Sequence, residues 1–456
     1  MCKKNKLSLL LLPALLSIAA PPTFAAVNEG DGTIDITAGV STLSNTPESA
    51  VAQAMSIFCP RLQSLDRPLN PEENRLSEIC GILVQNQSLT EEAYKELSAH
   101  SVTSITTLLS HGPMIVSLED IGSRLASLRR AARKLNVASW RNSEPLLAQT
   151  SILEATGGGA SADEQGGLYD NRLSGFVSGA YVNSKQTETE TLVGFKNDLY
   201  GLTLGLDYRF RHDAYAGIAT RLLNGNADLD DNAGSLDSND VNFTLYGTYF
   251  PTQSLYIDAT VQANRGNYDL SRRIDFTVNT VSASETAEGS TDGDQVGFSL
   301  GTGYEYTFGG PAITAQLSGI FRYNKAKLDA YTEQGAMGLN LNVDEQTIET
   351  QLLTVGAQFS KAFSYSWGVL IPQLDVNWKH DFKTDGQDIS TSFAADPFGT
   401  KFVFTTEDRD PDFFELALGV STVNPGGWSG FLQWASVIGY RNYDQNMLSL
   451  GVRKEF

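Results

Sequence analysis

Asn446-Met447-Leu448-Ser449-Leu450-Gly451-Val452-Arg453-Lys454-Glu455-Phe456 ends the chain, and apolar and polar side chains alternate along it. A two-residue period is typical of a β-strand with one apolar and one polar face. The residues on the apolar face are Leu448, Leu450, Val452 and Phe456. The stretch therefore predicts an amphipathic strand that ends on an aromatic residue.

Such an ending resembles the closing strand of a bacterial outer-membrane β-barrel, although a soluble sheet can also carry it as an edge strand. The composition favours the barrel. Of 456 residues, 41% are hydrophobic, and the mean hydropathy is −0.19. Beyond the first 20 or so residues, no apolar run approaches the roughly 20 residues that a spanning helix needs. Strands of a membrane barrel leave a weaker signal because only every second residue faces lipid.

The amino-terminal residues 1–25 read as a secretion signal. Lys3, Lys4 and Lys6 precede the apolar segment Leu7–Ala20, and small residues follow Pro21 and Pro22. This order predicts cleavage after Ala25, which also removes Cys2.

Two cysteines then remain in an exported chain, and they have no nearby histidine cluster that would suggest zinc. We therefore expect a disulfide between Cys59 and Cys80. The formal net charge of −20 makes nucleic acid an improbable partner.

Residues 26–113 predict a small helical unit. Thr46 followed by Pro47 is a helix start, a second helix is expected from about Glu72 to Asn86, and Ser88 begins a third. The proline residues after Phe58 are expected to interrupt the first helix. The disulfide would join the first two helices, which helps a unit with a thin core.

Residues 114–167 predict a further helix and a Gly-rich linker. Within Ser117–Val137 a narrow apolar stripe, which includes Leu125, lies opposite a basic face. The arginines of that face are Arg124, Arg129, Arg130 and Arg133. The pattern fits either a solvated surface helix or a helix inside an acidic pore.

Residues 168–456 predict twelve antiparallel strands. They begin near residues 172, 199, 214, 240, 255, 294, 312, 350, 367, 412, 428 and 445. Short connections such as Arg211–Asp213 and Pro251–Ser254 alternate with long ones near 183–198, 224–238, 265–293, 326–348 and 383–410. Short turns on one side and long loops on the other indicate an all-β transmembrane barrel.

This region resembles the translocator domain of type V autotransporters. The resemblance rests on several stretches taken in order. They are Asp198–Phe210, Ser235–Tyr249, Gly368–Phe382, Gly427–Phe431 and Gly451–Phe456, with Ile121–Arg129 before the barrel.

The resemblance implies a Gram-negative outer-membrane protein, exported by the Sec machinery, inserted by the barrel-assembly machinery and monomeric in lipid and lipopolysaccharide. It also implies that the basic helix threads the pore and pairs with acidic lumen positions. Those positions are Asp207, Asp258, Glu305, Asp375 and Glu415. The four residues of the apolar carboxy-terminal face would be the assembly signal. The departure is the short helical passenger, since no long repeat precedes the barrel.

No enzyme, cofactor or metal site is expected. The four histidines are scattered, there is no H-E-x-x-H motif, and Asp228–Gly234 lacks the glycine position and final glutamate of a calcium loop. The pair Arg272-Arg273 either meets lipopolysaccharide phosphates or faces water.

Three functions remain open from the sequence. The first is a barrel that translocates or displays its helical unit. The second is a structural or channel-type outer-membrane protein whose helical unit is a periplasmic plug. The third is an adhesin that acts through Gly266–Asp292 and Lys383–Asp410.

Overall fold

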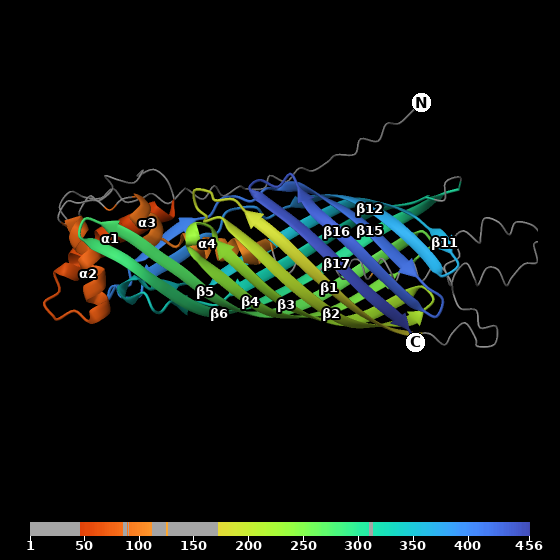
Figure 1. Cartoon of the computed structure of the whole chain (residues 1–456), viewed down its shortest axis with the longest axis horizontal. Coiled ribbons are helices and arrows are strands. Elements are labelled where there is room, and N and C mark those ends of the chain that lie inside the picture. Colours follow the sequence, from red (N-terminus) through yellow and green to blue (C-terminus); the bar gives the residue numbers. More distant parts are fainter. Residues whose placement is uncertain (1–45, 85–88, 90, 112–124, 126–171, 310–312) are drawn as a thin grey trace, which may run out of the picture. The chain divides into compact units, whose positions relative to one another are not determined.

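A computed structural model describes residues 46–84, 89, 91–111, 125, 172–309 and 313–456 (Figure 1). Twelve antiparallel strands close into a barrel, because β17 pairs with β1 and β10 pairs with β12. In chain order they are β1 Leu173–Gln186, β2 Phe195–Arg211, β3 Ala214–Leu229, β4 Gly234–Tyr249, β5 Leu255–Val278, β6 Val281–Phe308, β7 Ile313–Leu328, β10 Gln346–Lys361, β12 Gly368–Asp381, β15 Asp412–Val423, β16 Trp428–Ile438 and β17 Tyr443–Glu455. The predicted fold class and strand number are confirmed.

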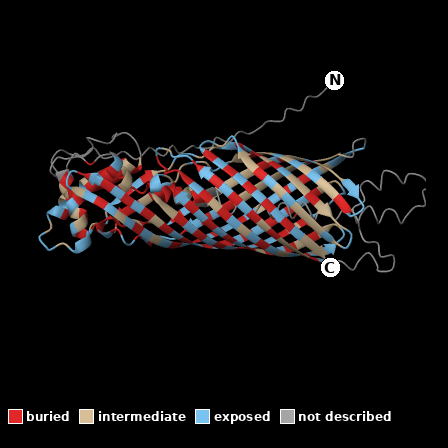
Figure 2. Ribbon diagram, viewed as in Figure 1, coloured by how far each residue is buried: buried red, intermediate tan, exposed pale blue. Residues whose placement is uncertain are grey.

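Side chains alternate between the two faces of every barrel strand, which gives the chequered burial pattern of Figure 2. On β2 the outward row includes Leu202, Leu204 and Leu206, each about half exposed, whereas Thr203 and Asp207 are buried inside. Leu448, Leu450 and Val452 lie on the outward face of β17 and are exposed as well. An apolar outer surface around a polar interior is the pattern that lipid requires.

Glycines of the barrel interior make room for aromatic rings of the neighbouring strand. A Cβ added at Gly205 would lie 2.2 Å from the ring of Phe176, and one at Gly217 would lie 2.4 Å from that of Tyr246. Each ring thus occupies the space that a side chain on the adjacent strand would need. We infer that these glycines are fixed by packing rather than by turn geometry.

At the end that carries the long connections, β5 and β6 extend beyond the outward rows of apolar residues. The segment expected as a loop, 265–293, is instead a continuation of β5 and β6, which remain paired up to Val278 and Val281. That expectation was wrong because the outward residues of this segment are polar and its apolar residues lie on the inward row. The row comprises Leu270, Ile274, Phe276, Val278, Ala283 and Ala287.

Two other expected loops form a second, four-stranded sheet. It joins β8 Tyr331–Thr332 and β9 Leu341–Val343 to β13 Asp388–Phe393 and β14 Lys401–Thr405. The 3₁₀ turn η3 (Met337–Leu339) links β8 to β9, η2 (Asp230–Asn232) links β3 to β4, and the short β11 (Phe363–Tyr365) lies at the other end of the barrel. We call this sheet, η3 and residues 265–293 the strand extension.

Four helices, α1 Pro47–Gln63, α2 Pro71–Val84, α3 Glu91–Leu97 and α4 His100–His111, make up the helical unit. Thr46 caps α1 through a capping box with Ser49, as its sequence position predicts. The helix continues through Pro60, contrary to expectation, because the proline lies in its last turn. Ser98 and Ala99 separate α3 from α4, a break that the sequence analysis did not anticipate. No described helix is both long and apolar enough to cross a membrane.

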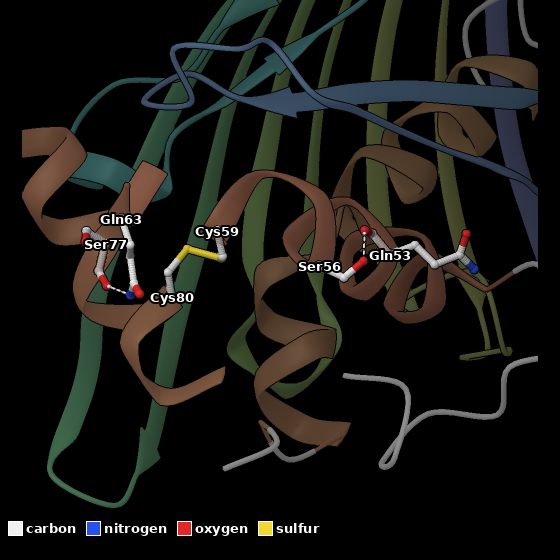
Figure 3. The surroundings of a disulfide bond; sticks show 6 residues. All are labelled: Gln53, Ser56, Cys59, Gln63, Ser77 and Cys80. Atoms are coloured by element: carbon white, nitrogen blue, oxygen red, sulfur yellow. Dashed lines mark hydrogen bonds between the residues drawn. A yellow bond between two sulfur atoms is a disulfide. The ribbon is translucent and has the colours of Figure 1, made fainter. Parts of the chain in front are cut away.

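The expected disulfide between Cys59 and Cys80 is present and joins α1 to α2 (Figure 3). Their Cα atoms are 5.2 Å apart, and both residues are buried. Gln63 Nε2 donates a hydrogen bond to the carbonyl of Ser77 beside the bridge, at 3.5 Å. The bridge holds the two helices as a hairpin.

We predict that replacing both cysteines, Cys59→Ala with Cys80→Ala, destabilises the helical unit by about 3 kcal/mol, because the bridge closes a loop across 21 residues. The rate of limited proteolysis within residues 47–84 measures this change. An unchanged rate in the double variant would contradict the prediction.

We also predict that Gly205→Ala slows or blocks barrel closure, since the new methyl group meets the ring of Phe176. The control is Gly319→Ala on β7, where nothing lies within 4 Å of the added Cβ. Folding is measured by the heat-dependent gel mobility of the barrel. Equal behaviour of the two variants would refute the packing argument.

Candidate functional site: lumen and strand extension

The five predicted acidic lumen residues lie on the inward-facing rows of their strands. Asp207 is 1% exposed and accepts hydrogen bonds from Tyr246 and, at 3.1 Å, from Ser174. Asp375 accepts a hydrogen bond from Gln358 at 2.6 Å. The other inward positions are Asp258, Glu305 and Glu415. The barrel thus gathers these carboxylates around one interior.

Basic side chains that the sequence analysis missed also line the interior. Lys379 Nζ lies 2.6 Å from Glu415 Oε2, and both side chains are almost fully buried. Arg221 on β3 is 2% exposed, and Arg322 on β7 donates to Thr354 at 2.9 Å. Their inward positions follow from the same two-residue period that identified the acidic residues. The lumen is therefore mixed in charge rather than uniformly acidic.

The predicted pore-helix arginines, Arg124, Arg129, Arg130 and Arg133, lie outside the described residues, and their pairing with the lumen stays a prediction. Leu125 is described, is helical and is 3% exposed. It packs in one cluster with inward aromatic residues at the short-turn end of the barrel. They are Tyr215, Tyr246, Phe250, Tyr256 and Phe176. A residue that precedes the barrel in sequence therefore lies inside it.

The helical unit packs on the opposite end, against the strand extension (Figure 1). The ring of Phe58 on α1 meets that of Phe393 on β13 edge-on, with centroids 5.7 Å apart. Ser104 on α4 donates to the carbonyl of Val193 in the β1–β2 connection at 2.8 Å. The helices thus contact segments from several strands at the end that carries the long connections.

Arg272, one of the two arginines considered for lipopolysaccharide, is buried and points away from solvent. Its guanidinium forms two hydrogen bonds with Glu333, at 2.6 and 3.0 Å, and both side chains are about 95% buried. It also donates to the carbonyls of Leu339 and Glu96, at 2.9 and 3.2 Å. The expectation of a lipid or water contact was therefore wrong for Arg272. The neighbouring Arg273 is half exposed and pairs with Asp275.

A serine, a histidine and a carboxylate meet inside the helical unit. Ser98 Oγ lies 2.9 Å from His100 Nδ1, and His100 Nε2 lies 3.3 Å from Glu48 Oε1. The serine hydroxyl donates to the carbonyl of Lys95, and the serine is 1% exposed. Substrate has no access to it, so we interpret the group as a buried network at the start of α4.

The pentapeptide Gly297-Phe298-Ser299-Leu300-Gly301 matches the G-x-S-x-G pattern, which the sequence analysis overlooked. In hydrolases that pattern forms a sharp turn between a strand and a helix. Here it lies in the middle of β6, and Ser299 hydrogen-bonds to Thr260 on β5 at 2.7 Å. Within the described part of the chain, no group of three or more potential ligands is placed to hold a metal ion.

Burial lowers the pKa of His100 below its ordinary value of 6.5, and the nearby Glu48 opposes that shift only in part. Below about pH 6.5 the unfolded chain therefore takes up a proton that the folded unit resists, so acid weakens the fold. We predict that the melting temperature of the helical unit falls between pH 7.5 and 5.5, and that His100→Gln reduces this fall. Equal slopes in both proteins would contradict the assignment.

Comparison with known proteins agrees with this architecture. Outer membrane protein A of Rickettsia conorii is 27% identical over 229 residues, which are 49% of this chain and 11% of that protein. Lipase 1 of Photorhabdus luminescens is 24% identical over 277 residues, 60% of this chain and 41% of that protein. The chain thus spans less than half the length of either relative.

The translocator domain of autotransporter NalP from Neisseria meningitidis shares the fold. It aligns with a TM-score of 0.50 at 16% identity, over 62% of this chain and 89% of that one. The family model for the autotransporter beta-domain matches residues 175–435, more than half of the chain. With the closed barrel, these matches show that the protein is an outer-membrane barrel that belongs to the autotransporter beta-domain family.

Proposed function

We propose that the barrel translocates the helical unit through its own lumen and displays it, folded, at the cell surface. The observation that carries this proposal is the position of Leu125. The helical unit lies at the long-connection end, Leu125 lies inside the lumen near the short turns, and β1 begins at the short-turn end. Leu125 follows the helical unit and precedes β1 in sequence, and its position inside the lumen is what translocation through the pore requires.

The different lengths of the connections at the two ends of the barrel indicate which end faces the medium. Outer-membrane barrels have short turns on the periplasmic side and longer connections outside. Here the carboxy-terminus and the short turns, such as the one between β2 and β3, share one end. The helical unit lies at the other end, which by this rule faces the medium.

The same placement disfavours a periplasmic plug, since a plug would pack at the short-turn end. The adhesin alternative assumed that Gly266–Asp292 and Lys383–Asp410 are free loops. The first is a paired hairpin, and the second carries β13 and β14. These segments support the helical unit instead of standing as free loops. An enzymatic role has no support in the described residues, where Ser98 and Ser299 both lie in structural networks. We therefore propose a non-enzymatic display function.

The test uses two epitopes in intact cells, one inserted near Asn45 and one near Asp231. We expect both to be labelled, since both positions would be outside. The control is an epitope in the turn 251–254, which should be labelled only after the outer membrane is permeabilised. Labelling near Asp231 but not near Asn45 would show that the amino-terminal unit stays inside.

A further inference from the structure

One hydrophobic core spans the helical unit and the strand extension. Phe58 and Leu76 from the helices, Ile274 and Phe276 from β5, and Phe404 from β14 belong to the same buried cluster. Four of the five are fully buried, with no exposed surface, and Phe276 is 5% exposed. Neither half therefore has a complete core when it is separated from the other.

The end of the β5–β6 hairpin depends on the helices. Beyond Arg272 on β5 and Gly293 on β6, the two strands no longer pair with β4 or β7, and apart from one bridge between Glu288 and Gln334 they pair only with each other among the described strands. A two-stranded ribbon is marginally stable in water. The docked helices cover the apolar inward face of the hairpin and also form hydrogen bonds with its backbone. Asp275 N–H donates to Glu96 Oε2 at 3.2 Å, and the carbonyl of Ser282 accepts from Arg75 at 2.6 Å.

Arg272 connects three parts of this assembly. It extends from β5, pairs with Glu333 next to β8, and donates to the backbone of α3 at Glu96 and of η3 at Leu339. Glu333 accepts a further hydrogen bond from Leu341 N–H at 2.9 Å. A buried arginine with all of these acceptors fixes the position of α3 relative to the barrel. Breaking such a buried pair is costly, because one charge is left in the interior.

A second close contact joins η3 to α2. A Cβ added at Gly338 would lie 2.3 Å from the carbonyl oxygen of Glu72 and 2.8 Å from the amide of Leu76. The two backbones approach so closely that only glycine fits. Nearby, Arg75 pairs with Glu285 of β6 at 2.6 Å.

We propose that the strand extension is an intramolecular receptor that holds the helical unit on the mouth of the barrel as a permanent lid, with Arg272 as its positioning residue. The lid itself does not depend on the proposed function. Only the claim that the lid faces the outside of the cell rests on that function. The extension does not release the unit, because both partners would expose the shared core.

The test is hydrogen–deuterium exchange of the purified full-length protein in detergent, followed in peptides from α1 and α2. In the unaltered protein these helices should exchange slowly. In Arg272→Met they should exchange on the order of a hundredfold faster, since the helices open when the buried pair is lost. Peptides from the outward-apolar part of β2 and β3 report that the barrel itself remains folded.

The matched control is Arg265→Met on the same strand. Arg265 is 72% exposed and pairs only with Asp292 among the described contacts, so its loss should leave exchange unchanged. Gly338→Ala tests the lid independently of charge and should accelerate exchange in α2. If Arg272→Met fails to assemble, Gly338→Ala decides the question.

Fast exchange of α1 and α2 in the unaltered protein, or slow exchange in both Arg272→Met and Gly338→Ala, would overturn the lid. These outcomes are distinct from failure of display. Protected helices in a protein whose epitope near Asn45 cannot be labelled on intact cells would refute display and leave the lid. A labelled epitope on a protein with unprotected helices would refute the lid and leave display.

Discussion

The closed ladder of backbone hydrogen bonds is the constraint on which the rest of this structure depends. A strand in hydrocarbon has no water to satisfy its amide and carbonyl groups, so each edge must find a partner. Here β1 pairs with β17 over its whole length, and β10 pairs with β12 from Leu352 to Ser360. Closure requires an even number of strands if the first strand is to begin, and the last strand is to end, on the same side of the membrane. It also separates every strand into a lipid face and an interior face.

The interior face changes character along the strands. On β5 the inward row is polar from Asp258 to Asn264 and becomes apolar from Leu270 to Val278, apart from Arg272. The outward row changes in the opposite sense, from Val261 to Asp269 and Asp275. The first half of the pattern suits a lumen within lipid, and the second suits a core covered by helices in water. One strand therefore serves two environments without any break in its pairing.

This inversion explains how much of the fold the sequence predicted. All twelve strands were anticipated, and eight of the observed starts lie within two residues of the expected ones, because one outward apolar face is a strong signal. The starts of β2, β4, β6 and β10 were placed four to thirteen residues late, since these strands begin at the long-connection end, beyond their outward apolar rows. There the apolar residues face inward and are diluted by charged outward ones, such as Asp269 and Glu288. A search of the sequence for outward apolar residues therefore assigns such a segment to a loop.

The candidate site was predictable to a smaller extent. Period-two counting located the inward carboxylates, and export with two cysteines indicated the bridge between Cys59 and Cys80. The roles of Arg272 and Gly338 depend on contacts between residues that are far apart in sequence, such as Arg272 with Glu96. The two-residue period of β5, continued past Asn264, would have placed Arg272 on the inward row, but the sequence analysis assigned that segment to a loop.

The length of the β5–β6 hairpin also sets how far the helices stand from the lipid. Residues 265–278 of β5 span about 46 Å along the strand, at roughly 3.3 Å per residue. With a tilt of about 40°, that length raises the hairpin end by about 35 Å along the barrel axis. The hairpin thus holds the helical unit away from the lipid. Its length can change only in steps of two residues per strand if the inward row is to stay inward. Longer or shorter hairpins would hold the same helical unit at different distances from the lipid.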